Sequence, residues 1–226
     1  MSLSIHEVLL ALQLADSAFP SGAFTFSWGL EGLMADGLIE SKQDVLEIVE
    51  EQLTFRWAGF DRAFLTAAHT TIDESELMEI DRLAEASIPM AALRAGSRRA
   101  GRRLLGIFAE MGFARAQSYR QQIGQVAELG HLPVVQGLVF REAGLGLDTA
   151  TLTSGWTTLS GLVSAAIRLG LVGHRDAQKI LTQQRANVER IVSTPLPARA
   201  GPWSFTPLLD IAIGRSADRT GKMFAT

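Results

Sequence analysis

The chain contains no cysteine among its 226 residues. This absence excludes a disulfide framework, zinc sites built on thiolates and cysteine nucleophiles. The start of the sequence, residues 1–7, has neither the basic residues nor the apolar run of a signal peptide. The most apolar stretch, residues 159–172, is interrupted by Ser160, Ser164 and Arg168, and it is too short and too polar to span a bilayer. We therefore expect a cytoplasmic protein with no membrane partner.

The sequence also lacks the common motifs for nucleotide binding and catalysis. The only Gly-Lys pair, Gly221-Lys222, has Ser216 where a phosphate-binding loop needs its first glycine. A dinucleotide fingerprint that starts at Gly144 has Thr149 at its third glycine position. The histidines show no i, i+4 pair, so we expect capping or surface roles for them: His6, His69, His131 and His174. These absences predict a protein that is not an enzyme and binds no cofactor tightly.

Helical signals dominate what is present. Apolar residues make up 47% and charged residues 20%, which is typical of a globular domain, and a net charge of −3 argues against nucleic acid as a partner. Capping patterns and apolar periodicity predict helices over residues 4–16, 23–34, 41–55, 73–87, 90–110, 117–127, 131–143, 148–169 and 175–192. Asp148 is the expected cap of the helix that Gly170 ends. The prediction is an all-α, single-domain bundle of about eight to ten helices over residues 1–199, with an irregular C-terminal tail, residues 200–226, as a partner-binding segment.

Four aromatic rings lie close together near the N-terminus. The corner contains Phe19, Phe24, Phe26 and Trp28 around the turn Pro20-Ser21-Gly22. Such rings either fill the core beneath a helix–loop–helix corner or form part of a partner surface, where aromatic residues are enriched. The sequence leaves both alternatives open.

The segment 14–31, which ends in Ser27-Trp28-Gly29-Leu30-Glu31, resembles the N-terminal motif of the UreF family of urease accessory proteins. Two further stretches are similar to motifs of that family, residues 131–137 and residues 164–173. The tail agrees over residues 206–212, which include Asp210. It then departs, because Ser216-Ala217 stands where the family commonly has His-Glu, and Lys222-Met223-Phe224 stands where it has Arg-Leu-Phe.

The resemblance implies a homodimeric, all-helical adaptor. Such a protein would bind a UreD/UreH-type scaffold and recruit the GTPase UreG, and the complex would deliver nickel to the urease apoprotein with GTP hydrolysis. Nickel would then be handled by the complex. The residues expected to meet partners are Phe19, Pro20, Ser21, Gly22, Phe24, Trp28, Glu31, Arg94, Arg168, Asp210, Lys222 and Phe224.

Arginines raise further alternatives. Arg94, Arg98 and Arg102 share one helix face, with Arg99 and Arg103 beside them. This face is either solvated and paired with nearby carboxylates or offered to an acidic protein, with RNA the weaker choice.

Arg168, expected to be partly buried among small residues, either ties helices through an ion pair or presents its charge to a partner.

Two rival functions of the protein remain. One is a GTPase-activating protein that supplies an arginine, with Arg94, Arg168 and Arg175 as candidates. The other is a helical enzyme with a small-molecule pocket, which would need convergent titratable groups.

Overall fold

The computed structural model describes residues 4–20, 27–197, 201–216 and 224, and all regular structure in them is helical. Because α3, η2 and α4 run on without a break, and η3 continues α7, the described residues form ten helical segments. This confirms the expected all-α bundle in a single domain. The helices are α1 Ile5–Ala15, α2 Leu30–Ala35, α3 Lys42–Gln52, the π-helix η2 Leu53–Asp61, α4 Arg62–Thr70, α5 Glu74–Ser87, α6 Ala91–Glu110, α7 Ala114–Gln122, the 3₁₀ turn η3 Ile123–Gln125, α8 Leu132–Glu142, α9 Leu147–Arg168, α10 His174–Ser193 and α11 Pro207–Ser216.

Side-chain caps begin several helices where the sequence predicts them. Ser4 and Ser41 each form a complete capping box, with Glu7 and Asp44 as the reciprocal partners. Two expected starts are wrong. Gly146, not Asp148, is the N-cap of α9. Asp148 lies in the first turn, where the helix dipole stabilises its negative charge. The helix expected over residues 23–34 begins only at Leu30; residues 21–26 lie outside the described residues.

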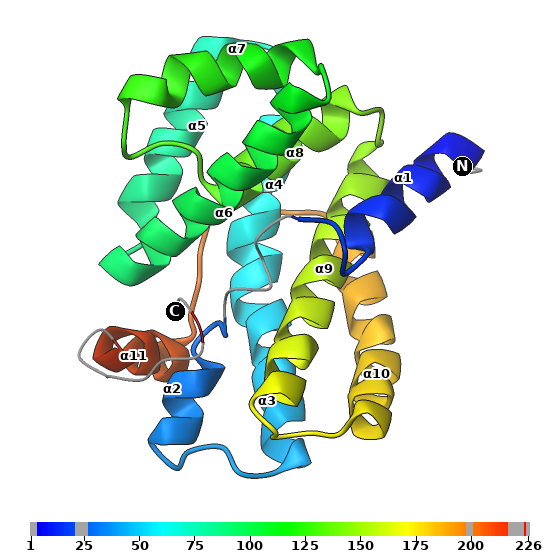
Figure 1. Ribbon diagram of the computed structural model, residues 1–226, viewed down its shortest axis with the longest axis vertical. Coiled ribbons are helices and arrows are strands. Elements are labelled where there is room, and N and C mark those ends of the chain that lie inside the picture. Colours follow the sequence, from blue (N-terminus) through cyan, green and yellow to red (C-terminus); the bar gives the residue numbers. More distant parts are fainter. Residues whose placement is uncertain (1–3, 21–26, 198–200, 217–223, 225–226) are drawn as a thin grey trace.

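A continuous rod, residues 42–70, organises the molecule (Figure 1). The sequence predicted only its first half, because the π-helix in its middle widens the turn and breaks the 3.6-residue period. Arg62, just beyond the π-helix, is buried and donates hydrogen bonds to the carbonyl oxygens of Ile191 and Thr194. The rod is thereby tied to the end of α10.

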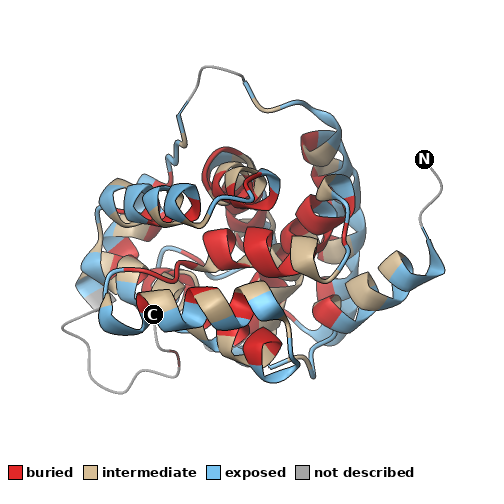
Figure 2. Cartoon of the chain, turned by 90° about the horizontal axis from the view of Figure 1, so that it is seen from above, coloured by how far each residue is buried: buried red, intermediate tan, exposed pale blue. Residues whose placement is uncertain are grey.

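Buried residues fill the interior (Figure 2), and they form two apolar clusters that both include residues of the rod. Phe60, Phe64 and Leu65 belong to the cluster that lies among α5, α6, α7 and α8. Leu53 and Trp57 belong to the cluster shared with α2, α9, α10 and α11. The π-helix therefore lies where the two clusters meet.

Close packing of α4 on α8 explains one glycine of the 131–137 motif. A Cβ atom at Gly137 would lie 2.4 Å from the carbonyl oxygen of Leu65, so only glycine lets the two backbones approach this closely. This glycine of the motif is thus accounted for by packing within the chain. In the described part of the chain, no helix is both long enough and apolar enough to cross a membrane.

Candidate partner-binding surface

The described part of the aromatic corner faces the interior of the molecule. Phe19 is half-buried and packs edge-on against Phe108, with ring centroids 6.4 Å apart. Trp28 is also half-buried and lines two small hollows that it shares with Leu132. Pro20 is exposed. Ser21, Gly22 and Phe24 lie outside the described residues.

The residues after the corner form a seat for α11. Gly29 has φ +89°, a conformation that favours glycine, and Leu30 behind it is fully buried. A Cβ atom at Gly32 would lie 2.8 Å from the carbonyl oxygen of Ala212. The Gly-Leu-Glu part of the N-terminal motif therefore allows the C-terminal helix to pack closely on α2.

Phe224, near the end of the chain, also packs on this seat. Its side chain is 5% exposed, and its N–H donates to a carboxylate oxygen of Glu31 at 3.2 Å. The guanidinium of Arg168 lies over the ring, 4.3 Å from its centroid, in cation–π geometry. Phe224, expected to meet a partner, therefore packs within the chain itself. The structure also corrects the expected burial of Arg168, whose side chain is exposed. Lys222 lies outside the described residues.

An extended segment leads to α11 along the π-helix. The N–H groups of Trp203 and Phe205 donate to the carbonyl oxygens of Gly59 and Phe55, at 3.1 and 2.8 Å. The indole of Trp203 lies directly on Gly59, where a Cβ atom would be 2.4 Å from the ring. The position of this segment therefore depends on both the widened helix and its glycine.

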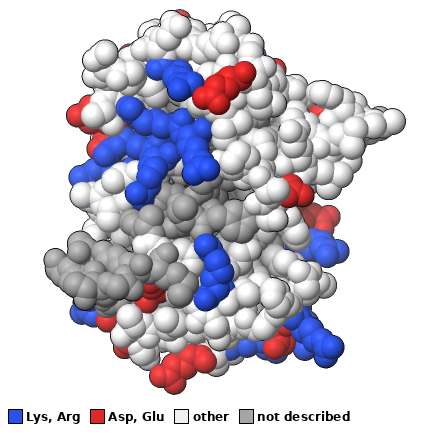
Figure 3. All heavy atoms as spheres, viewed as in Figure 1, with Lys and Arg blue, Asp and Glu red and all other residues white. Residues whose placement is uncertain are grey.

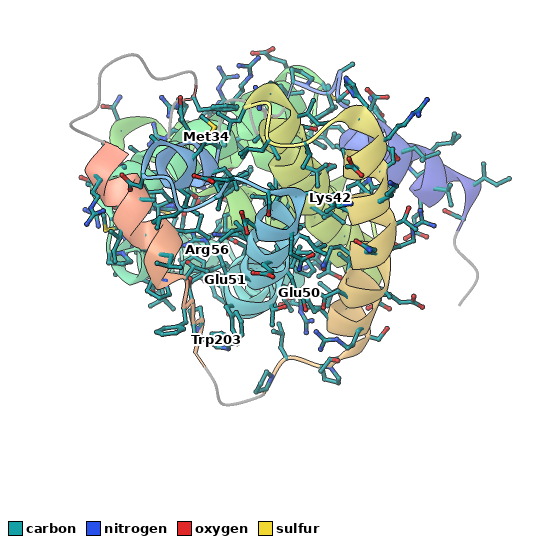
Figure 4. The ribbon with its side chains drawn as sticks, turned by 90° about the horizontal axis from the view of Figure 1, so that it is seen from below. Met34, Lys42, Glu50, Glu51, Arg56 and Trp203 are labelled. Carbon is teal, nitrogen blue, oxygen red and sulfur yellow. The ribbon has the colours of Figure 1, made fainter. Side chains whose placement is uncertain are left out.

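Five large apolar side chains are exposed over the start of the π-helix, this segment and α11. We call this surface the tail patch: Phe55 (44% exposed), Trp203 (43%), Phe205 (68%), Leu208 (51%) and Ile211 (52%). Figure 4 shows Trp203 near Arg56 and Glu51, where the start of α11 approaches the rod. Exposed apolar groups gathered in this way are typical of interaction sites.

Carboxylates lie beside the tail patch. Burial raises the pKa of Asp210, although the nearby charge of Arg56 opposes this shift. Burial also raises the pKa of Glu51, and the charge of Asp210 adds to it. Arg56 itself is buried, with its Nε 3.6 Å from a carboxylate oxygen of Asp61 and its guanidinium 4.8 Å from the centroid of the Phe60 ring.

A second apolar surface lies on α1, which projects from the body (Figure 1). Its exposed residues are Ile5 (81%), Val8 (40%), Leu9 (61%) and Leu12 (63%). Glu7 holds the helix in place, because its carboxylate accepts hydrogen bonds from the N–H of Gly146 and the hydroxyl of Thr149 at the start of α9. Exposed apolar groups on one face of a helix are typical of interaction sites.

The UreF family model matches residues 39–185. The chain is 32% identical over 227 residues to the urease accessory protein UreF of Trichodesmium erythraeum (strain IMS101), covering 98% of this chain and 97% of that protein. It is 27% identical over 231 residues to the urease accessory protein F of Oryza sativa subsp. indica, covering 100% of this chain and 87% of that protein.

The chain belongs to the UreF family. The N-terminal family motif has a structural role in this chain. Its last three residues, Gly29, Leu30 and Glu31, support the docking of the C-terminal helix and of Phe224. Within the described residues, the end of this motif and the helix that contains Asp210 pack against each other.

The arginine-rich helix α6 of this UreF-family chain is largely engaged with its own fold. Arg94 and Arg98 both pair with Glu85. Arg94 also donates to the carbonyl oxygens of Ile88 and Pro89, at 2.7 and 3.1 Å. Burial raises the pKa of Glu85, but hydrogen bonds from Arg98 and His131 outweigh this and leave it below its ordinary value. Arg94, predicted as a partner residue, therefore also ties α6 to α5.

Histidines occupy more interior positions than the sequence predicts. His131 is fully buried, with Nε2 2.8 Å from a carboxylate oxygen of Glu85, and burial lowers its pKa. His69 is also buried, with Nε2 2.9 Å from the carbonyl oxygen of Leu145. The expected capping or surface role is therefore wrong for both side chains. Among the described residues, no three side chains of the metal-binding types gather at one site.

Sequence reasoning missed Trp203 and Gly59. Neither belongs to a catalytic or binding motif, and they are 144 positions apart in the chain. The proline-rich stretch around Trp203 gave a weak signal. Prolines and glycines predict that this stretch is not helical, so its aromatic ring must pack on another element of the fold. The π-helix that receives it had no recognisable pattern.

Proposed function

We propose that this chain is a urease accessory protein that acts as an adaptor. It bridges a UreD/UreH-type scaffold and a UreG-type GTPase, so that nickel reaches the urease apoprotein in a GTP-dependent step. Membership of the UreF family supports this proposal, as does the similarity to urease accessory proteins over almost the whole chain. In this account the chain catalyses no reaction and nickel is the cargo of the complex.

The observation that carries the proposal is the tail patch. Its residues combine two aromatic rings of the 203–205 segment with aliphatic side chains of α11, and all are 43–68% exposed. Aromatic residues in an apolar surface with a charged rim are the usual anchors of protein interfaces. We assign this patch to the scaffold.

The apolar face of α1 is assigned to a second copy of the chain. Four exposed apolar side chains at helical spacing suit a two-fold contact, in which the same face meets itself. This assignment also gives the adaptor two scaffold sites, one on each protomer.

The GTPase-activating alternative has less support. A trans arginine must reach the nucleotide of its partner. Arg94 is held by Glu85 and two carbonyl oxygens, and Arg168 lies over the Phe224 ring. The small-molecule enzyme is also less well supported, because the hollow beside Trp203 is lined mainly by apolar residues such as Phe64, Ile80 and Leu83.

A pull-down with the scaffold tests the proposal. We expect Phe205→Asp combined with Leu208→Asp to abolish co-purification, because both side chains are more than half exposed and belong to the patch. Ile72→Asp is the matched control, since Ile72 is 74% exposed in the turn between α4 and α5, at the end of α4 far from the π-helix. Undiminished binding by the double variant, at an unchanged melting temperature, would overturn the assignment.

A further inference from the structure

Arginines gather along the solvent side of α6. Ala95, Arg99 and Arg103 are exposed at successive turns of the helix, and half-buried arginines flank them. Arg120 extends from α7 toward Gly106, where a Cβ atom would lie 3.9 Å from its guanidinium. We call this surface the arginine ridge: Arg94, Arg98, Arg99, Arg102, Arg103 and Arg120. Figure 3 shows the basic side chains gathered over α6 on this face.

The positive charge of the ridge exceeds the charge of the partners that hold it. Arg94 and Arg98 share the single carboxylate of Glu85, and Arg120 lies 3.5 Å from a carboxylate oxygen of Glu110. Arg102 donates to the carbonyl oxygens of Ile123, Val126 and Leu129, which carry no net charge. These contacts fix the guanidinium groups without cancelling their charge. A chain of net charge −3 therefore carries a preorganised cationic surface.

The chemistry of the ridge favours carboxylates over nucleic acid. Planar guanidinium groups pair bidentately with carboxylates, and arginines one helical turn apart match acidic side chains at the same spacing on a partner helix. The exposed positions between the arginines hold small residues such as Ala95, which allow close approach. No aromatic side chain stands among the exposed residues of α6 to stack on a base, and the whole chain is acidic.

We propose that the arginine ridge is a docking surface for an acidic segment of a protein partner, separate from the tail patch. The inference rests on the proposed function, because an adaptor needs a second surface for its second partner. Arg99 and Arg103 provide the exposed contacts. The positioned guanidinium groups of Arg94, Arg98 and Arg102 add to the positive electrostatic potential. Binding on this surface weakens as salt is raised, since Arg99, Arg103 and Arg120 are exposed.

A fluorescent poly-L-glutamate peptide tests the ridge without any urease protein. Polarisation titrations at low and high salt compare the full chain with Arg99→Glu/Arg103→Glu. The control Arg175→Glu/Arg185→Glu makes the same change in net charge at exposed positions of α10. We expect the ridge variant to bind at least about tenfold more weakly and the control to stay within about twofold of wild type. Both variants should keep the wild-type melting temperature.

Three outcomes overturn the proposal. The first is no peptide binding by wild type, or equal binding by the ridge variant. The second is an equal loss in both variants, which would make the effect one of net charge alone. The third is tighter binding of a single-stranded oligonucleotide of matched charge, which would identify the ridge as a nucleic-acid site. Scaffold pull-down with the ridge variant separates the two proposals, because the variant retains the tail patch and should still bind.

Discussion

Individual residues determine how the tail reaches the body, and Gly59 is the clearest case. The indole of Trp203 occupies the space that a side chain would need, and the adjacent backbone accepts the N–H of Trp203. Within the described residues, the backbone of Trp203 donates one hydrogen bond here, to the carbonyl oxygen of Gly59, so the fit of the ring against the helix supplies most of the contact. A small side chain at Gly59 should therefore loosen the packing of the tail before it disturbs the helical structure of the rod.

We predict that Gly59→Ala lowers the free energy of unfolding by about 1–3 kcal/mol, because the new methyl group must displace the Trp203 ring. Urea denaturation measures the change, and limited proteolysis of the C-terminal segment reports whether the tail has loosened. Gly161→Ala is the matched control: no atom lies within 4 Å of its Cβ position. As a helical Gly→Ala change, it should stabilise by about 0.5–1 kcal/mol. Equal effects of the two substitutions would refute the role of Gly59.

His131 makes stability depend on pH. Burial lowers its pKa below the ordinary value of 6.5, although the charges of Asp81 and Glu85 favour the protonated form. The unfolded chain therefore takes up a proton at higher pH than the folded chain. The contribution of His131 to the free energy of unfolding is complete above pH 6.5. It is lost as the pH falls from there toward the lowered pKa of the folded state.

We predict that His131→Gln flattens this dependence. Between pH 6.5 and 5, the stability of wild type should fall more steeply than that of the variant, by up to about 1.4 kcal/mol per pH unit. Urea denaturation at several pH values gives the two slopes. His69 remains in both proteins and does not act on His131, so its own titration cancels in the comparison to first order. Parallel curves would show that His131 does not titrate differently in the folded state.

At the scale of helices, capping chemistry was easy to predict and packing was not. Ser4, Ser41 and Asp73 begin helices as expected, because each side chain bonds to an N–H three residues later. Residues 56–70 gave no clear prediction, since the π-helix removes the regular period on which such reasoning depends. The burial of His131 could not be foreseen either, because its partner Glu85 is 46 residues away.

The same limit applies to the candidate site. The sequence pointed to the corner and the tail separately, and both contain described residues that the structure brings together. What it could not show is that Glu31 and Phe224 meet, since they are 193 residues apart. A polar, proline-punctuated tail is usually mobile unless it is docked. Here the docking depends on a buried ring that composition alone cannot place.

Helix α1 should control self-association. We predict that Leu9→Asp converts the proposed homodimer into a monomer, because a buried charge at a two-fold contact would face its own copy. Light scattering after size-exclusion chromatography measures the mass, and circular dichroism verifies that the helices remain. Gln178→Glu, an exposed change on α10, is the control for added charge. A dimeric Leu9→Asp variant would place the contact elsewhere.

The end of the tail should contribute to folding. We predict that Phe224→Ala lowers the free energy of unfolding by about 1.5–3 kcal/mol, the usual contribution of a buried large apolar side chain. Phe205→Ala, which changes a ring that is 68% exposed, should cost much less. Thermal and urea unfolding compare the two. If both variants are equally stable, the Phe224 ring is not part of the core, and the tail acts only through partners.

At the scale of the whole molecule, three surfaces face different directions around one helical body. The tail patch lies over the rod and α11, the apolar face of α1 projects from the opposite side, and the arginine ridge follows α6 (Figure 1). An adaptor must present separate sites so that partners bind at the same time. The arrangement fits that requirement, since each surface is built on a different helix.

The central claim is that this chain links the scaffold to the GTPase. Its most direct test is co-expression of a UreD/UreH-type scaffold and a UreG-type GTPase, with and without this chain, followed by size-exclusion chromatography. We predict one peak that contains all three proteins when the chain is present, and separate scaffold and GTPase peaks when it is absent or carries Phe205→Asp/Leu208→Asp. A stable scaffold–GTPase complex that forms equally well without this chain would contradict the account.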